Sequence, residues 1–339
     1  MDLNETKTSE ITIKERVRLL STEKIALCYI FLTLLYALLL GDDIPAAAVT
    51  NRLLILAGTA ALWLLHCCVP QKWVRILRNA YQLALLAYWY PDIYYFSQVM
   101  PSSDHFFAQI DQEMFHCQPS VMLSQWLSGF FWQELFNMGY FSYYLMIAGV
   151  VVWAIFKKPR LFNRVASVTL CSFMLYYLIF LFVESAGPQF YFPAIGADNV
   201  KAGVFPAVGH YFQEHSELTH TMPEGGLFTH LVHAAQGSEK PIAAFPSSHV
   251  GLSTILLLLA FSMSRRLSLI MLPFYIILCV STVYIGAHYA IDVFGGWVSA
   301  IIIFGLAHLI YYTSFIHGPK HHHSHRHKSK PVEERSVPI

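Results

Sequence analysis

Phe245-Pro-Ser-Ser-His249 joins a long polar segment to a hydrophobic run that opens at Val250. Pro246 suits the first turn of a helix, where its missing N–H is no loss, and Ser247 and Ser248 can cap the helix or donate to an incoming oxygen. The unpaired N–H groups and the dipole at such a helix start favour negative charge. The stretch therefore predicts a helix N-terminus suited to an anion.

A second polar stretch, Gly286-Ala-His288-Tyr-Ala-Ile-Asp292, lies at the mouth of another hydrophobic run. His288 and Asp292 are spaced i,i+4, so on a helix they share a face and the carboxylate can hold the imidazole. Between the two stretches lie two hydrophobic runs and a turn around Arg265-Arg266, enough chain to cross a bilayer and return. We therefore expect His249 and His288 to meet on one membrane face.

The composition is that of a polytopic membrane protein. Hydrophobic residues make up 55% of the chain and charged residues only 13%, whereas soluble domains carry about 25% charged residues. The formal net charge of +1 leaves no basic face for a nucleic-acid backbone, so no nucleic-acid partner is expected. The six cysteines show no metal-ligand spacing and no evident disulfide framework.

Eight hydrophobic runs come close to the roughly 20 residues that a membrane-spanning helix needs. They cover residues 25–41, 52–70, 76–98, 135–156, 163–183, 247–264, 267–286 and 288–314. The sequence thus predicts an all-α polytopic membrane protein with about eight transmembrane helices. Its expected parts are a cytoplasmic N-terminal segment (1–24), three N-terminal transmembrane helices (25–98), an extracytoplasmic amphipathic segment (99–134), a catalytic transmembrane core (135–314) that includes the loop 185–246, and a disordered His-rich cytoplasmic tail (315–339).

Lysine and arginine in the short loops predict the orientation of the chain. Basic residues within 72–78, 157–164 and 265–266 alternate consistently to one side, which the positive-inside rule makes cytoplasmic. Both termini fall on that side. The segment 99–134, which its aromatic content predicts to form interfacial helices, falls on the other side with the loop 185–246 and both histidine stretches. The reactive face is therefore expected to be extracytoplasmic, whether periplasmic or lumenal.

Further histidines invite a metal assignment that their surroundings do not favour. The loop 185–246 contains His210, His215, His220, His230 and His233. None of these comes with a carboxylate or cysteine at a recognisable ligand spacing, so we expect no metal site and no cofactor. The tract from His321 to His327 is metal-prone by composition, but a disordered tail is the favoured interpretation.

The residue types in the two polar stretches predict phosphoryl transfer through a phosphohistidine. A carboxylate such as Asp292 fixes the tautomer of an attacking histidine and stabilises its cationic intermediate, which makes His288 a candidate nucleophile. His249, placed across the electrophile, would protonate a leaving oxygen and later deprotonate an incoming hydroxyl. Ser247 and Ser248 would contact the non-bridging phosphate oxygens at the helix start.

Three further residues are candidates for binding substrate. Asp111, Gln118 and Gln189 could contact a polar head group at the interface. Capping or ordinary loop hydrogen bonding explains each of them at least as well.

At these residues the chain resembles the type 2 phosphatidic acid phosphatase superfamily. Pro246-Ser-Ser-His249 is similar to the second signature motif of that family, and the stretch from Ser281 to Asp292 is similar to the third. The resemblance is closer to the branch that contains inositol phosphorylceramide synthases, through Asp111, Phe115 and Gln118-Pro119-Ser120 and through Gly187-Pro188 in place of the first motif.

The resemblance implies a six-helix core preceded by two extra spans. It also implies that His288 is the nucleophile, that Asp292 orients it, and that His249 acts as acid and base. Phosphatase members generally carry a Lys and an Arg in the first motif and an Arg in the third, where this chain has Gly187-Pro188 and Thr282.

The shortage of cations bears on the substrate. The fixed cations expected on the extracytoplasmic face are Arg52, Lys201 and Lys240. A phosphate monoester carries up to two negative charges near neutral pH and a diester only one. Because uncompensated charge in a partly dry site is costly, the diester is favoured, unless Lys201 or Lys240 folds into the site.

Three functions therefore remain open on the sequence alone. The leading hypothesis is a phosphotransferase that moves phosphoinositol from phosphatidylinositol to a lipid hydroxyl such as that of ceramide, with both lipids entering from the bilayer. The second is a phosphatase of a lipid phosphate or a polyprenyl diphosphate that uses the same residues with water as acceptor. The third is a transport or scaffold protein whose histidines line a pathway.

Overall fold

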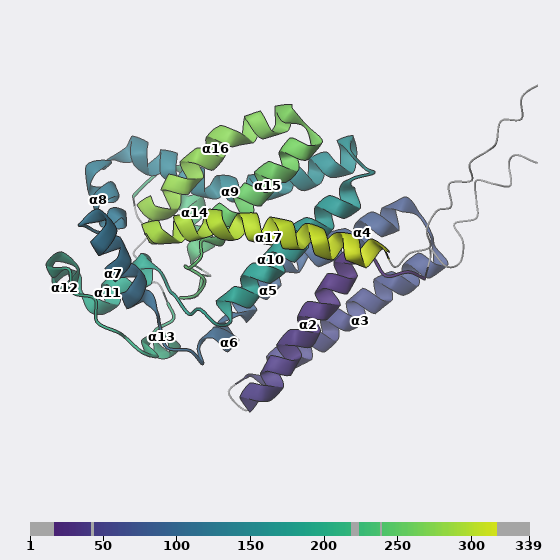
Figure 1. Cartoon of the computed structure of the whole chain (residues 1–339), viewed down its shortest axis with the longest axis horizontal. Helices are drawn as coiled ribbons and strands as arrows, with labels where there is room; N and C mark the ends of the chain where they lie inside the picture. Colours follow the sequence, from purple (N-terminus) through teal and green to yellow (C-terminus); the bar gives the residue numbers. More distant parts are fainter. Residues whose placement is uncertain (1–16, 42–43, 218–223, 238, 317–339) are drawn as a thin grey trace, which may run out of the picture.

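Long apolar helices dominate this computed structural model, which describes residues 17–41, 44–217, 224–237 and 239–316 (Figure 1). Six helices of the described chain are long and apolar enough to cross a membrane. They are α2 (Ser21–Leu40), α3 (Ala46–Cys68), α9 (Phe130–Lys157), α10 (Phe162–Phe180), α16 (Arg265–Tyr284) and α17 (Ala290–Ile316). The predicted all-α polytopic membrane fold is confirmed. Within the predicted terminal segments, residues 1–16 and 317–339, which include His321 to His327, lie outside the described residues.

A seventh apolar helix, α15 (Ser248–Met263), is shorter than these six and lies inside the bundle. It packs against α9, α10, α16 and α17. Its side chains at Val250, Leu252, Leu256 and Leu259 are almost completely buried. Neighbouring helices cover most of its surface, although Leu258 and Phe261 near its C-terminal end are exposed. Its 16 residues are fewer than the roughly 20 that span a bilayer.

The predicted third span, 76–98, differs from the expectation because it is not one helix. The chain forms α4 (Lys72–Ala84), α5 (Leu86–Asp92) and α6 (Tyr94–Ser97) in succession. Pro91 lies inside α5, and a proline there removes a backbone donor and crowds the preceding turn. The eight predicted runs therefore correspond to six long helices, the shorter α15 and this broken segment.

Short helices fill the two segments predicted to be extracytoplasmic. The first contains α7 (Asp104–Phe115) and α8 (Pro119–Trp126). The second contains α11 (Pro188–Ile195), α12 (Ala197–Ala202), α13 (Tyr211–Glu214) and α14 (Leu227–Gln236). Phe106 and Trp126 are exposed, as the interfacial interpretation of the first segment requires. His220 of the second segment lies outside the described residues.

The starts of α15 and α17 lie side by side, which brings the two histidine stretches together. The Ser247 amide donates to the Asp292 carbonyl at 3.0 Å. Gly296 permits this approach, because a Cβ there would lie 2.8 Å from the Ser247 carbonyl oxygen. The bundle thus gathers its predicted reactive groups at one end.

A buried ion pair fastens the broken segment to α3. Arg52 and Asp92 meet at 2.6 Å, and both side chains are almost fully buried. The Arg52 guanidinium also lies 5.4 Å from the ring of Trp89 and 4.9 Å from that of Phe96. The ion pair occupies Arg52, so this predicted extracytoplasmic cation is not free to hold a phosphate.

Replacing Asp92 with alanine is expected to destabilise the protein by about 3–5 kcal/mol, because Arg52 is left as an unpaired buried charge. The check is the midpoint of thermal unfolding of the purified protein in lipid nanodiscs. The double replacement Arg52→Met and Asp92→Leu is the control and should recover most of the loss, since it removes both charges. An unchanged midpoint for the single variant would contradict the role given to the pair.

Candidate active site

His249 and His288 form the centre of the site. His249 lies in the first turn of α15, and His288 lies in the loop between α16 and α17. The distance from His288 Nε2 to His249 Nδ1 is 3.3 Å, and the two rings meet edge to face. The structure thus places together the two histidines that the sequence predicts to meet.

The contacts of His288 fix its tautomer. Its Nδ1 lies 2.8 Å from the Ala244 carbonyl oxygen, which can only accept, so Nδ1 carries the proton. Nε2 is then the basic nitrogen, and it faces His249. Burial lowers the pKa of His288 to about 4, with the Ala244 hydrogen bond working in the opposite direction. His288 is therefore a neutral imidazole with an available lone pair near neutral pH.

Asp292 lies beside His288 but not in the way that helical spacing predicts. His288 precedes the helix, which begins at Ala290, and a turn brings the two side chains together. Asp292 Oδ2 lies 3.4 Å from His288 Nδ1 and accepts the Tyr289 amide at 2.8 Å. The predicted pairing of carboxylate and imidazole is present, and backbone geometry rather than a shared helix face produces it.

Ser247 is the N-cap of α15. Its Oγ accepts the Val250 amide at 3.3 Å, which leaves the hydroxyl hydrogen able to donate. Pro246 precedes the cap, so its predicted place in the first helical turn is wrong by this small shift. Ser248 is the first helical residue and is buried beside the cap. Contact of either hydroxyl with phosphate remains a prediction.

Two tyrosines of α9 hold the His249 ring, and no sequence motif pointed to them. The rings of Tyr140 and Tyr143 lie 4.6 Å and 4.5 Å from that of His249. Both tyrosines are buried. Their positions in a long apolar run looked like ordinary packing, and only the approach of α9 to the start of α15 gives them a place at the site.

Asp111 caps the start of α17, and its contact with a head group remains a prediction. Its two carboxylate oxygens accept the amides of Ala290 and Ile291 at 2.8 Å and 2.9 Å. Burial raises the pKa of Asp111 to about 6, and the two amide hydrogen bonds work against this shift. These contacts agree with the alternative of a capping role, since the Asp111 carboxylate positions the start of α17.

Gln118 also makes internal contacts. Its Nε2 donates to the Ala108 carbonyl at 2.9 Å and to Gln112 Oε1 at 3.2 Å, and the side chain is buried. These bonds connect α7 to the start of α8. The Gln118 Oε1 atom is buried without a hydrogen-bond partner, and its contact with a head group remains a prediction.

Asp104 is a further buried residue of the site that sequence reasoning missed. Its carboxylate accepts the amides of Ala186 and Gly187 and the hydroxyl of Tyr289, each within 2.9 Å. These bonds fasten the loop before α11 to the residue that follows His288. The sequence could have indicated Asp104, because it lies two helical turns before Asp111 and so shares its face of α7.

Gln189 belongs to a polar cluster with Glu239 and Gln236. Gln189 Nε2 donates to Glu239 Oε2 at 3.2 Å, and Gln236 Nε2 donates to Gln189 Oε1 at 3.0 Å. The Tyr140 hydroxyl, whose ring stacks on His249, donates to Glu239 Oε1 at 3.3 Å. Burial raises the pKa of Glu239, with the bonds from Gln189 and Tyr140 opposing the shift. The cluster therefore adjoins the histidine pair.

Cations are held away from this site in the described chain. Lys240 Nζ contacts Ser216 Oγ at 3.3 Å and lies over the ring of Tyr94. Lys201 lies on α12 with its side chain exposed. No hydrogen bond among the described residues joins a Lys or Arg to His249 or His288. Among the same residues, no group of three His, Cys, Asp or Glu side chains could hold a metal ion.

The fold and the site define an integral-membrane protein with a paired-histidine centre at one end of a helical bundle. Residues 105–306, more than half of the chain, match the PAP2 superfamily, and the chain belongs to that family. Membership indicates an enzyme that acts on phosphate esters. No curated protein matches the chain, and no solved structure does.

Proposed function

We propose that the protein is a membrane phosphotransferase of the inositol phosphorylceramide synthase type. It moves phosphoinositol from phosphatidylinositol to a lipid hydroxyl such as that of ceramide and releases diacylglycerol. The observation that carries the proposal is the cluster of Glu239, Gln189 and Gln236 beside the histidine pair, which no Lys or Arg of the described residues contacts. Carboxyl and amide groups pair with the hydroxyls of a neutral polyol, which inositol provides.

The proposed chemistry uses the two histidines in sequence. His288 Nε2 attacks phosphorus and the bond from phosphorus to the diacylglycerol oxygen breaks. His249, which must enter this step in its imidazolium form, gives that oxygen a proton and becomes neutral. The acceptor hydroxyl then attacks phosphorus, His249 takes its proton, and the bond from phosphorus to nitrogen breaks. Because the two rings are in contact at 3.3 Å, His249 has to turn away to admit the phosphate between them.

Local charge favours a diester over a monoester. Asp292 and Asp104 lie close to His288, directly or through Tyr289, and no Lys or Arg of the described chain contacts the histidines. A phosphate with two negative charges would meet these carboxyl groups without a compensating cation, which is costly in a partly dry site. A phosphodiester brings one charge, which the Ser247 hydroxyl and the start of α15 can receive.

The test is turnover in proteoliposomes that contain phosphatidylinositol, labelled in its inositol phosphate, and ceramide. Inositol phosphorylceramide and diacylglycerol should form in equal amounts. Release of labelled inositol phosphate or phosphate without labelled ceramide would contradict the proposal.

The second candidate is a phosphatase of a lipid phosphate or a polyprenyl diphosphate. The same histidine pair and Asp292 favour it, because water can replace the acceptor hydroxyl in the second step. It requires phosphate release from phosphatidic acid or a polyprenyl diphosphate without an acceptor lipid. A transport or scaffold role would be favoured if His288→Ala and Asp292→Asn left every lipid product in cells unchanged.

The basic loops support the proposed orientation, with both termini cytoplasmic and the active site extracytoplasmic. A membrane-impermeant lysine reagent applied to sealed cells should then leave Lys157 and Lys158 unlabelled. Labelling of both lysines without permeabilisation would show that the orientation is the reverse of the one proposed.

The low pKa of His288 sets the acid side of the pH profile. The pKa is lowered to about 4, so His288 is neutral above that pH and loses its nucleophilic lone pair as the pH falls through 4. We expect the acid limb of kcat/KM for the donor to fall near pH 4, since this parameter reports the free enzyme. A decline centred at pH 6.5 would indicate an unshifted histidine. The control is recovery of full activity after return from low pH to pH 7.

Replacing Glu239 with alanine is expected to raise KM for phosphatidylinositol about tenfold or more, because loss of a buried hydrogen-bonding group costs about 1–3 kcal/mol. The measurement is KM and kcat with phosphatidylinositol and with phosphatidylglycerol, whose head group has fewer hydroxyls. Glu239→Gln should keep most of the affinity, since an amide also binds hydroxyls. An equal rise in KM for both donors would show that Glu239 does not recognise the inositol head group.

A further inference from the structure

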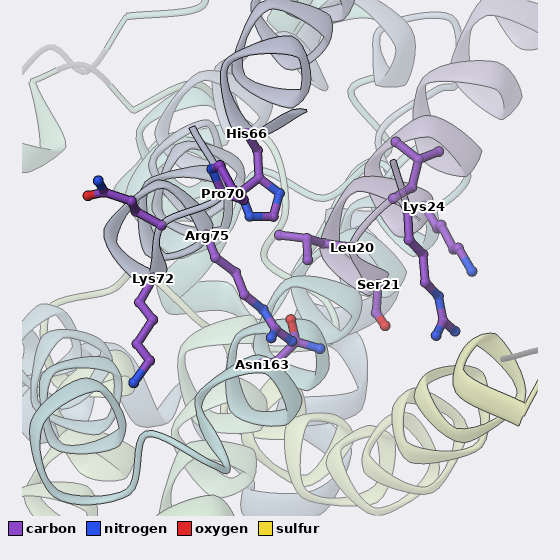
Figure 2. A pocket seen from close by; sticks show the side chains of 11 residues that line it. Leu20, Ser21, Lys24, His66, Pro70, Lys72, Arg75 and Asn163 are labelled. Atoms are coloured by element: carbon purple, nitrogen blue, oxygen red, sulfur yellow. The ribbon is translucent and has the colours of Figure 1, made fainter. Parts of the chain in front are cut away.

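A cavity of about 390 Å³ opens where the start of α2, the end of α3, the start of α4 and the start of α10 meet (Figure 2). This volume is in the range of small-molecule sites. Four cationic side chains line it, from Arg18, Lys24, Lys72 and Arg75. Among its described lining residues there is no Asp or Glu. The cavity therefore presents concentrated positive charge.

This cavity lies at the opposite end of the bundle from the histidine pair. The helix α17 begins beside His288 and ends near α2, where Lys24 Nζ donates to the Ser314 carbonyl at 3.2 Å. Its 27 residues correspond to roughly 40 Å of helix. The cavity is thus separate from the active site and lies on the face that the basic loops predict to be cytoplasmic.

A carboxylate next to the cavity, that of Glu23, is engaged by a cation that does not line it. Glu23 accepts from the buried guanidinium of Arg78 and from the Leu20 amide. The same guanidinium donates to His66 Nδ1 at 2.7 Å. Because Arg78 can only donate, the His66 proton lies on Nε2, which leaves this cavity residue as a further donor. The lining of the cavity therefore offers positive charge and hydrogen-bond donors, which suit an anion with several acceptor oxygens.

The surroundings favour a lipid over a soluble anion. Figure 2 shows Lys72 and Arg75 of α4 across the cavity from Ser21 and Lys24 of α2. Next to the basic pair, Trp73 and Leu77 expose 51% and 40% of their surface. Tryptophan prefers the boundary between head groups and hydrocarbon. If the phosphate of a phospholipid were held in the cavity, the acyl chains of that lipid would therefore lie beside apolar side chains.

We propose that this cavity binds the phosphate of an anionic phospholipid in the leaflet opposite the active site. Basic pockets between membrane helices on the cytoplasmic side suit such head groups. The bound phosphate would connect α2 and α4 through the cations that line the cavity, with His66 at the end of α3 as a further donor. This proposal does not depend on the reaction that the histidine pair performs.

The test measures binding of phosphatidylglycerol by native mass spectrometry of the purified full-length protein, titrated from mixed phosphatidylcholine micelles. Lys72→Gln with Arg75→Gln should weaken binding about 20-fold, since each cation near an anionic head group contributes a several-fold effect. The matched control is Lys157→Gln with Lys158→Gln, which removes the same charge from exposed positions at the end of α9. The control should bind as the unchanged protein does.

Two outcomes would overturn the proposal. Equal weakening by both double variants would mean that general surface charge, not the cavity, attracts the lipid. Competition by glycerol 3-phosphate at the same concentration as the lipid would assign the cavity to a soluble phosphate ester. Lys72 and Arg75 are exposed, so correct folding of their variant can be verified by unchanged lipid turnover at the distant histidine site.

Discussion

Replacing His288 with alanine is expected to lower kcat for head-group transfer at least about 10⁴-fold, because removal of a covalent nucleophile abolishes the main route to product. The Nε2 of this histidine is unprotonated and faces His249, which has to turn away to admit phosphorus. The measurement is steady-state turnover in proteoliposomes. Binding of the donor lipid should change far less than turnover.

The intermediate provides a second readout of the same prediction. After brief exposure to phosphatidylinositol labelled with ³²P, the unchanged protein should carry acid-labile label, as expected for a phosphoinositol group bound to a histidine nitrogen. His288→Ala should carry none. His249→Ala serves as the comparison, since it retains the nucleophile and should label slowly. Full labelling of the His288 variant would assign the covalent step to another residue.

Replacing Asp292 with asparagine is expected to lower kcat about 10⁴-fold, which is the size of effect seen when a catalytic histidine loses its orienting carboxylate. The carboxylate lies 3.4 Å from His288 Nδ1 and stabilises the positive charge that develops as Nε2 bonds to phosphorus. An amide cannot supply that charge. The measurements are kcat and the midpoint of thermal unfolding, and only kcat should change greatly.

Asp111→Asn is the matched control for Asp292→Asn, because both replacements remove a buried carboxylate near the start of α17. Asp111 accepts the amides of Ala290 and Ile291 and does not contact either histidine. We expect a loss of about 1–2 kcal/mol in stability, typical of a lost helix cap, with less than a tenfold change in kcat. Similar losses of kcat in the two variants would show that Asp292 acts through helix placement and not through charge.

The sequence alone predicted the helical membrane fold and the pairing of the two histidine stretches. Run length and composition determine which segments can cross a bilayer, so the positions of α2, α3, α9, α10, α16 and α17 could be read directly. Local chemistry also gave the Ser247 cap. The broken segment α4 to α6 was less predictable, because the length of the run 76–98 suggested a single span although Pro91 lies within it.

Only the tertiary structure decided which polar groups adjoin the histidines. Asp111 and Asp104 bond to backbone groups 179 and 82 positions further along the chain, and Glu239 meets Tyr140 across 99 positions. Motif spacing carries no information about such partners, because they come together only when separate helices pack. The sequence therefore determined the helices and the reactive residue types, whereas packing decided their hydrogen-bond partners and hence the surroundings of the proposed nucleophile.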